Sequence, residues 1–324
     1  DSTDGRDVYG NGGSVERFEQ QLCTLFNKPN AVFLPTGTLA QCAAMKCYSE
    51  PSGLKEIGLH PTSHLLLHEH MAIESLWGLT PIKIGTGTSV LTFDDVRQLD
   101  ATQLSAIIIE LPMREIGGVL PKWDDLLNIR QWCDNHNVKL HMDGARVWQT
   151  TPYYQNRLQD IAALFDSVYV SFYKDLGGIF GAALLGESQF INQSRVWARR
   201  AGGNPITQYP EVIAARRGVS HYIDQMPSYV EYTLILCDLL QSLPLQILPE
   251  KPQASMFHLT FAMSPETLAS KVVRYAEQTG IVVLPLPRAG DEKHAICEIS
   301  IGDRALLHPP EYWAEHLHRC LNLI

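Results

Sequence analysis

The chain has 324 residues, 45% of them hydrophobic, and a formal net charge of -9 at pH 7. This composition predicts a globular protein with a large core, arranged as one or two domains. Nucleic acid and anionic membranes are excluded as main partners because no basic field exists to hold phosphates, and no apolar run approaches the roughly 20 residues of a membrane span. A small metabolite is the expected partner. Asp1 to Asp7 do not resemble a signal peptide, so we expect a cytoplasmic location.

The first predicted elements are a helix, a strand and a second helix. Glu16 to Phe26 has the apolar spacing of an amphipathic helix, and Ala31 to Leu34 is a short, β-prone strand. Pro35-Thr36-Gly37-Thr38 then leads into a helix that begins near Leu39. Free backbone N–H groups at such a helix start, beside a glycine and two threonine hydroxyls, suit a phosphate monoester, and an ordinary helix cap is the alternative.

The histidines between residues 60 and 70 raise the question of a metal site. His64 and His68 have the i,i+4 spacing of zinc ligands on a helix, but there is no complete HExxH motif. A histidine ring stacked on a planar cofactor fits better, and a buried histidine bonded to the backbone is the remaining alternative. The seven cysteines are scattered and form no CxxC pair, which favours reduced thiols over disulfides or zinc. We therefore predict no metal.

From Pro81 to Leu240 strand-like and helix-like segments alternate, which is typical of an α/β domain with a mostly parallel sheet. The expected strands are 82–84, 106–110, 138–142, 166–170 and 180–186, and the expected helices are 93–99, 123–135, 191–200, 212–222 and 229–240. After Pro252 the pattern changes to strands at 256–261, 281–284 and 296–301, with helices at 265–279 and from Glu311. We therefore predict a large domain over residues 1–240 and a small α+β domain over residues 241–324.

Four polar segments follow expected strands and would meet at one edge of a parallel sheet, where open α/β sheets bind their ligands. They are Pro35–Thr38, Glu110, Asp143–Arg146 and Ser171–Lys174. A lysine between a strand and a glycine-rich loop, such as Lys174, can form a Schiff base with a carbonyl cofactor such as pyridoxal phosphate, whereas a solvated loop lysine is the alternative. Asp143 at a buried strand end needs a cationic partner, either a protonated pyridine nitrogen or Arg146, unless it is a helix N-cap.

Six segments in order resemble the threonine aldolase / beta-eliminating lyase family of fold-type I pyridoxal-phosphate enzymes, over the range from about Asp7 to Tyr209. The matching segments are Asp7–Gly10, Phe33–Thr38, His64 with Glu69, Gly118–Pro121, His141–Arg146 and Lys174–Gly177. The resemblance implies an α/β large domain like that of aspartate aminotransferase, with a mostly parallel sheet, plus the small C-terminal α+β domain. It also implies pyridoxal 5'-phosphate as the cofactor.

The resemblance further implies roles around the cofactor. Lys174 would carry the Schiff base, and Asp143 would keep the pyridine nitrogen protonated so that the ring acts as an electron sink. His64 would stack on the ring and help to take the proton from the substrate's β-hydroxyl. Gly37 and Thr38 would hold the cofactor phosphate.

The resemblance also implies substrate contacts and an oligomer. Arg146 would lie beside the cofactor and hold the carboxylate of the amino acid, and Tyr9 is the second candidate for substrate binding. Tyr9 and the pair Arg199-Arg200 resemble segments that reach a neighbouring subunit's site, although a basic helix end such as Arg199-Arg200 also complements the helix dipole. We therefore expect a homodimer or homotetramer with its active sites at the dimer interface.

The implied activity is that of a low-specificity L-threonine aldolase, which cleaves L-threonine, L-allo-threonine or a related β-hydroxy-α-amino acid to glycine and an aldehyde. A β-eliminating lyase or racemase is the alternative within the class, since it would keep Lys174 and Asp143 but act on a different bond or amino acid. A non-catalytic module gains little from an intact lysine, aspartate and phosphate loop. A zinc hydrolase built on His64, His68 and His70 ranks last.

The sequence departs from the family pattern beside the expected site. Tyr173 and Asp175 flank Lys174 where serine and glycine are usual, and Leu111-Pro112-Met113-Arg114 stands where the family often has a polar segment. We expect these differences to change the substrate pocket rather than the cofactor.

The expected carboxylate-binding arginine is a further departure. The family has one near Ile296–Glu298, where this sequence has none, so Arg288, Arg304 or Arg146 has to serve instead. The usual amino-terminal Arg-Ser-Asp segment is missing as well.

Overall fold

A computed structural model describes residues 5–323. Of the segment Asp1 to Asp7, which we expected not to be a signal peptide, Asp1–Asp4 lie outside the described residues. The described chain forms two compact units. Unit 1 runs from the amino-terminal segment to Met113 and resumes with Leu120–Asp224, and unit 2 holds Arg114–Val119 and the chain from Gln225 onward. The domain boundary predicted between residues 240 and 241 falls later than this division, which assigns the helix before that boundary to unit 2.

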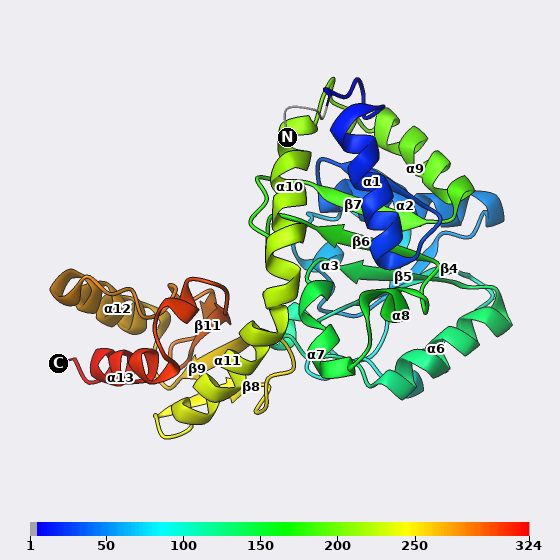
Figure 1. Cartoon of the computed structure of the whole chain (residues 1–324). Helices are drawn as coiled ribbons and strands as arrows, with labels where there is room; N and C mark the ends of the chain where they lie inside the picture. The colour runs from blue at the N-terminus through cyan, green and yellow to red at the C-terminus, as the bar shows by residue number, and fades with distance from the viewer. Residues whose placement is uncertain (1–4, 324) are drawn as a thin grey trace. The chain divides into compact units, whose positions relative to one another are not determined.

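Unit 1 is built on a seven-stranded sheet. Its strands are β1 (Asn30–Leu34), β2 (Glu56–Leu59), β3 (Thr80–Lys83), β4 (Leu104–Glu110), β5 (Lys139–Gly144), β6 (Ser167–Ser171) and β7 (Ala182–Gly186), in the order β1-β7-β6-β5-β4-β2-β3. Strands β6, β5, β4, β2 and β3 are parallel neighbours, and β7 is antiparallel to both β6 and β1. The predicted mostly parallel sheet is therefore confirmed, and the strand directions place the carboxyl ends of β1, β4, β5 and β6 at one edge. Figure 1 shows β5 and β6 side by side and pointing the same way.

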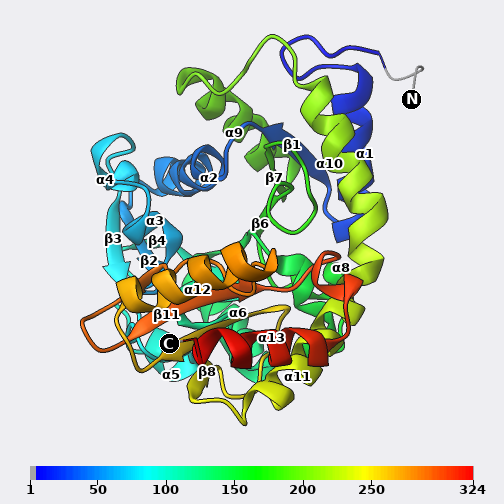
Figure 2. The ribbon, with the colours of Figure 1, turned by 90° about the vertical axis from the view of Figure 1, so that its left-hand side faces the viewer.

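Helices cover both faces of this sheet. They are α1 (Gly13–Phe26), α2 (Gly37–Ser52), α3 (His64–Leu67), α4 (Ala72–Ser75), α5 (Phe93–Val96), α6 (Trp123–His136), α7 (Thr151–Tyr154), α8 (Leu158–Ala162), α9 (Ser188–Arg200) and α10 (Tyr209–Tyr222), with a 3-10 turn η2 (Val147–Gln149). In Figure 2, β1 and β7 stand between α1 and α10 on one side and α2 and α9 on the other. The helices predicted at 16–26, 123–135, 191–200 and 212–222 are confirmed, whereas the helix predicted at 93–99 ends at Val96.

An aromatic cluster fixes the chain that leaves β6. The ring centroids of Phe18 and Phe172 lie 5.0 Å apart, and the ring of Phe33 stacks on that of Phe172 at 5.8 Å. All three side chains are at most 2% exposed. Because burial of such rings removes a large apolar area from water, Phe172 anchors the backbone two residues before Lys174.

Unit 2 contains a four-stranded antiparallel sheet in the order β10-β11-β9-β8. Its elements are the strands β8 (Leu245–Leu248), β9 (Met256–Phe261), β10 (Ala289–Gly290) and β11 (Ala295–Ser300), the helices α11 (Met226–Leu240), α12 (Pro265–Thr279) and α13 (Pro310–Leu321), and the 3-10 turns η1 (Arg114–Ile116) and η4 (Ala305–Leu307). A further turn, η3 (Ile223–Gln225), lies at the division. Within residues 5–323, no helix combines the length and the apolar character needed to span a membrane.

One predicted strand is wrong. Residues 281–284 form no strand, and the two-residue strand β10 pairs with β11 instead. The side chains of Ile281 to Leu284 are β-prone, but Gly280 ends α12 with a φ of 73° and prolines follow at 285 and 287. Because a proline cannot donate to a strand ladder, the segment stays irregular, and part of it lines an apolar cavity. Strands β2 and β8 were missed from the sequence.

Candidate active site

Lys174 follows β6 in a loop that is held at several points. The Gly178 amide donates to the Phe172 carbonyl at 2.8 Å, and Gly177 has a φ of 63°, which favours glycine. Burial lowers the pKa of Lys174 below its ordinary value, although the carboxylate of Asp143 acts in the opposite direction. The amine is therefore easier to deprotonate than that of a solvated lysine, as a nucleophile requires.

Asp143 lies near the carboxyl end of β5, in register with Glu110 of β4 and with Tyr169 of β6. The residue is 2% exposed, and its Oδ1 accepts a hydrogen bond from the Ala145 amide at 3.2 Å. A buried carboxylate is stable only with donors or a positive charge nearby, so this position suits a protonated ring nitrogen.

The start of α2 lies at the carboxyl end of β1. The Thr36 hydroxyl oxygen accepts from the Leu39 amide at 3.2 Å, so the helix cap that we considered for this segment is present. A Cβ on Gly37 would lie 2.1 Å from the Tyr169 hydroxyl, which excludes larger residues. The first amides of this 16-residue helix carry partial positive charge and can bind a phosphate. The Thr36 cap therefore does not exclude a phosphate site at the start of α2.

His64 begins the short helix α3 and is bound to Glu69. Its Nε2 lies 2.8 Å from Glu69 Oε1, and its ring centroid is 5.0 Å from that of His68. Burial lowers the pKa of His64, while the charge of Asp143 raises it and that of Lys174 lowers it. The imidazole is therefore neutral near pH 7 and senses the charges of both Asp143 and Lys174.

The metal interpretation has no geometric support. Among residues 5–323, no group of three or more His, Cys, Asp and Glu side chains is arranged to hold an ion. His60 is 4% exposed, and its Nδ1 lies 2.7 Å from the Thr62 hydroxyl, so a neighbouring side chain pairs one of its two ring nitrogens.

Arg146 and Asp175 meet beside Lys174. Arg146 Nε lies 3.8 Å from Asp175 Oδ1, and the two side chains are 14% and 9% exposed. Burial raises the pKa of Asp175 to about 6, although the charge of Arg146 and a hydrogen bond with Gln149 act to lower it. Sequence reasoning selected Arg146 as a site residue and noted Asp175 only as a departure from the family pattern.

Tyr9 lies apart from these buried groups, in an exposed turn with a φ of 52°. Its amide donates to the Ile206 carbonyl at 2.9 Å, and the guanidinium of Arg199 sits over its ring at 5.6 Å. Arg200 in turn lies over the ring of Trp197 at 4.6 Å. Tyr9 and Arg199, which were predicted as two separate segments, are therefore in contact on the surface of unit 1.

Tyr169 and Gln149 were missed from the sequence. Tyr169 reads only as a buried strand residue, yet its hydroxyl faces the start of α2 and its pKa is raised well above the usual value by burial and by Asp143. Gln149 is 1% exposed, and nothing in its local sequence distinguishes it from other polar residues after a strand. Both could be found only once the neighbouring elements were placed.

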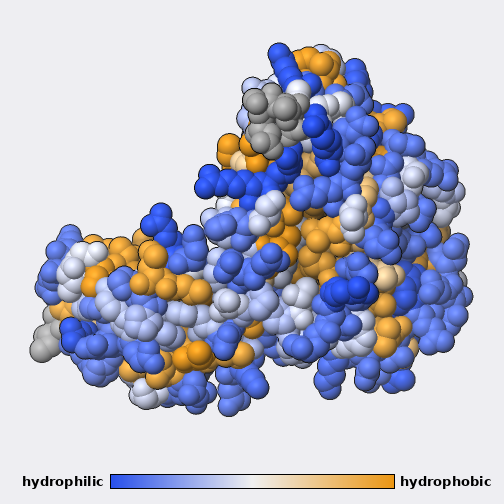
Figure 3. All heavy atoms as spheres, in the orientation of Figure 1, coloured by the Kyte–Doolittle hydropathy of each residue, from blue (hydrophilic) through white to orange (hydrophobic). Residues whose placement is uncertain are grey.

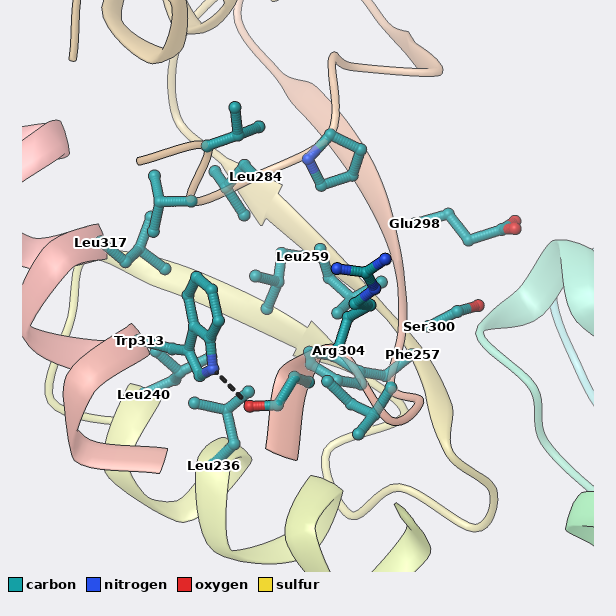
Figure 4. Close-up of a pocket in the computed structure, with 16 residues that line it drawn as sticks. Leu236, Leu240, Phe257, Leu259, Leu284, Glu298, Ser300, Arg304, Trp313 and Leu317 are labelled. Carbon is teal, nitrogen blue, oxygen red and sulfur yellow. Dashed lines mark hydrogen bonds between the residues drawn. The ribbon is translucent and has the colours of Figure 1, made fainter. Parts of the chain in front are cut away.

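The two remaining arginine candidates lie in unit 2. Arg288 is bound to two carboxylates, those of Glu115 and Glu298, with an Nη2 to Glu115 Oε1 distance of 2.7 Å. Arg304 lines a cavity of about 510 Å³ (Figure 4) whose walls are mostly apolar. In that cavity the indole nitrogen of Trp313 donates to the Ala305 carbonyl at 2.9 Å. None of the predicted catalytic residues lines this cavity.

At the sheet edge of unit 1, the chain has a lysine amine with a lowered pKa, a buried carboxylate, the amino-terminal end of a long helix and a histidine with a lowered pKa. A carbonyl cofactor with a basic ring nitrogen and a phosphate group would find a partner for each of its polar groups here.

The chain is similar to proteins of known family. A model of the family described as beta-eliminating lyase matches residues 2–299. A solved structure from Listeria monocytogenes, provisionally described as an L-allo-threonine aldolase, is 37% identical with a TM-score of 0.93, and the match covers 99% of this chain and 89% of that one.

Curated relatives match over shorter ranges. The low-specificity L-threonine aldolase of Candida albicans is 24% identical over 220 residues, which is 62% of this chain and 56% of that protein. The alanine racemase TOXG of Cochliobolus carbonum is 28% identical over 225 residues, 67% of this chain and 56% of that protein. The chain thus spans little more than half the length of these two relatives.

The sheet and its helices are those of the fold-type I enzymes that depend on pyridoxal phosphate. Within that class, the chain belongs to the beta-eliminating lyase family.

Proposed function

We propose that the chain is an L-threonine aldolase of the low-specificity type, which cleaves L-threonine, L-allo-threonine or related β-hydroxy-α-amino acids to glycine and an aldehyde. The observation that carries the proposal is the placement of Asp143 near the carboxyl end of β5 and of Lys174 just after the neighbouring strand β6. His64 is near enough for its pKa to respond to the charges of both. The names of the Listeria and Candida relatives support the same substrate class.

The residues at this edge fit pyridoxal phosphate. Asp143, 2% exposed, offers a buried carboxylate to a protonated ring nitrogen, and Gly37 and Thr38 open α2, whose amides suit the phosphate. Lys174 would provide the amine that holds the cofactor through its carbonyl carbon. When bound, the cofactor supplies an electron sink for the bonds of the substrate's α-carbon.

The remaining steps are carried by side chains of the chain. Arg146 binds the substrate carboxylate and thereby orients the bond between the α- and β-carbons. His64 takes the proton of the β-hydroxyl, which allows the aldehyde to leave. Because Nε2 of His64 faces Glu69 at 2.8 Å and donates its hydrogen there, Nδ1 is the atom that accepts the proton.

The direct test is acetaldehyde release from L-threonine and from L-allo-threonine, measured with added pyridoxal phosphate. We expect release from both substrates and its loss in Lys174→Ala, together with the loss of the visible absorbance of the bound cofactor. No aldehyde from either substrate, in a protein that binds the cofactor, would refute the aldolase assignment.

A racemase or β-eliminating lyase is the second candidate, because a relative at 28% identity is an alanine racemase. Such an enzyme uses the same lysine and aspartate, so product analysis separates the candidates. An aldehyde indicates the aldolase, a keto acid indicates β-elimination, and D-alanine formed from L-alanine indicates the racemase.

A homodimer is part of the same proposal. Large apolar side chains are exposed in the segments that flank the site, among them Tyr173, Ile179 and Phe180 after β6 and Leu67 and Met71 near α3. Figure 3 shows apolar surface beside hydrophilic surroundings on unit 1. Exposed patches of this kind are typical of interfaces, and Tyr9 with Arg199 would then complete the site of the partner. Light scattering of the purified protein tests this, and a monomer would contradict it.

A further inference from the structure

Asp175 is an ionisable residue that the proposed mechanism does not use. It follows Lys174 directly, and its side chain is 9% exposed. Its Oδ1 lies 3.8 Å from Arg146 Nε, and Gln149 donates a hydrogen bond to the carboxylate. Its Oδ2 is buried and has no hydrogen-bond partner within residues 5–323.

The backbone around Asp175 fixes the direction of its side chain. Leu176 is completely buried, and a Cβ on Gly218 of α10 would lie 2.0 Å from the Leu176 carbonyl oxygen, so the loop and α10 are in close contact. Phe172 and Gly178 are joined by the hydrogen bond described above. Asp175 therefore cannot turn outward unless Leu176 leaves the core.

The position of Asp175 is costly for folding. Burial penalises its ionised form, the opposing charges of Arg146 and Lys174 do not compensate fully, and the pKa of the carboxyl is accordingly raised to about 6. A carboxylate that weakens the fold near neutral pH is better explained by the site beside it than by stability.

We propose that Asp175 is a positioning residue, which with Gln149 holds the Arg146 guanidinium in place beside Lys174 and offsets its positive charge there. The inference rests on the proposed role of Arg146 toward the substrate carboxylate. The charged groups that act on Asp175 are Arg146, which follows β5, and Lys174 on its own loop. A guanidinium held in advance loses less conformational freedom when it binds a carboxylate.

The first test measures the binding of glycine, the smallest α-amino acid, through the change in visible absorbance of the holoenzyme. In Asp175→Asn, which keeps the shape of the side chain, we expect the glycine dissociation constant to rise about tenfold, as for residues coupled in one ionic network. The effect should be absent when Arg146→Lys is already present, because both changes act through one guanidinium. An unchanged dissociation constant, or additive effects of the two substitutions, overturns the proposal.

Asp166 supplies the matched control. It precedes β6, whereas Asp175 lies beyond the other end of that strand, and its Oδ2 is 2.7 Å from Arg130 Nη1. Asp166→Asn therefore removes an arginine-paired carboxylate from the same unit without touching the site. We expect it to lower the urea midpoint of unfolding and to leave glycine binding within twofold of wild type. An equal loss of glycine binding in both variants would show a general structural effect and overturn the positioning role.

A readout without cofactor separates this inference from the aldolase proposal. In the cofactor-free protein, the rate at which an acylating reagent modifies Lys174 is followed against pH by peptide mass spectrometry. Because the Asp175 carboxylate raises the pKa of Lys174, Asp175→Asn should shift the profile to lower pH, and Asp166→Asn should not. An unshifted profile in Asp175→Asn overturns the inference. A shifted profile together with no aldehyde release would leave the inference standing and refute the aldolase assignment alone.

Discussion

Asp175 in unit 1 and Glu298 in unit 2 are both carboxylates beside arginines, with side chains 9% and 15% exposed, yet their pKa values move in opposite directions. Burial raises the pKa of Asp175 to about 6 because one arginine at 3.8 Å compensates only in part. Burial also acts to raise the pKa of Glu298, but interactions with His258, Arg114 and Arg288 outweigh it and lower the value to about 2.

The difference lies in geometry rather than in residue type. Arg114 Nε approaches Glu298 Oε2 at 2.8 Å, Arg288 binds the same carboxylate, and both arginines also bind Glu115. The charges of this quartet are paired in a closed ring, whereas the charges around Lys174 are only partly compensated. We therefore expect the paired charges of unit 2 to stabilise the fold and the partly compensated charges of unit 1 to serve the proposed reaction. Variants that remove one charge at a time can break or sharpen this contrast.

The largest effect is expected in unit 1 and on activity alone. Lys174→Ala should reduce aldolase activity by more than about a thousandfold, because the amine that binds the cofactor is lost. The free energy of unfolding of the cofactor-free protein should change by less than about 1 kcal/mol, since the removed charge was partly desolvated. Acetaldehyde assays and urea unfolding measure the two. A large loss of stability would contradict the contrast.

The next effect is expected in unit 2 and on stability. Glu298→Gln leaves Arg114 and Arg288 without one of their carboxylates, so the free energy of unfolding should fall by about 2–3 kcal/mol at pH 7. Urea unfolding followed by fluorescence measures this. A loss below about 0.5 kcal/mol would mean that the quartet is no more than a surface ion pair in energetic terms.

Asp175→Asn should have a smaller effect on stability and the opposite sign. Because the folded pKa of Asp175, about 6, lies above its ordinary value of 3.8, its ionisation costs stability above about pH 6, and the cost disappears as the pH falls toward 3.8. The variant should therefore be more stable than wild type at pH 8, by an amount on the order of 2 kcal/mol. Below pH 4 the difference should vanish.

The pH profile of Glu298→Gln is the matching comparison. The folded pKa of Glu298, about 2, lies below its ordinary value of 4.5, so its stabilisation is complete above pH 4.5 and is lost as the pH falls toward 2. Between pH 8 and pH 5 the deficit of Glu298→Gln should stay constant while the excess of Asp175→Asn shrinks. Parallel profiles would show that the two carboxylates do not differ as described.

The smallest effect is expected at an exposed pair. Arg319 and Glu315 form an ion pair on α13, and each side chain is 59% exposed. Glu315→Gln should change the free energy of unfolding by less than about 0.5 kcal/mol, because water and salt screen such pairs. This variant is the reference against which Glu298→Gln and Asp175→Asn are compared. An effect as large as that of Glu298→Gln would remove the distinction between buried and exposed pairs.

Much of the fold was predictable from local pattern. The segment 16–26 has the apolar period of a helix, and the short, isoleucine-rich run at 106–110 favours a strand by its length and β-branched content. Parallel strands bring their carboxyl ends to one edge. The strand predicted at 281–284 is wrong for a local reason. Its side chains have high β propensity, but the flanking glycine and prolines outweigh that propensity.

The sequence by itself determined the α/β rhythm and placed Asp143 near the end of one strand and Lys174 in the loop after another, because side-chain period and chain order need no knowledge of neighbours. Only the tertiary structure decided which charged side chains lie close enough to shift one another's pKa. Asp175 with Arg146, Tyr169 against Gly37, and the quartet of Arg114, Glu115, Arg288 and Glu298 join residues up to 184 positions apart. Such contacts depend on distances of a few ångströms between packed elements. The number of hydrogen bonds that a carboxylate accepts then decides whether its pKa is raised or lowered.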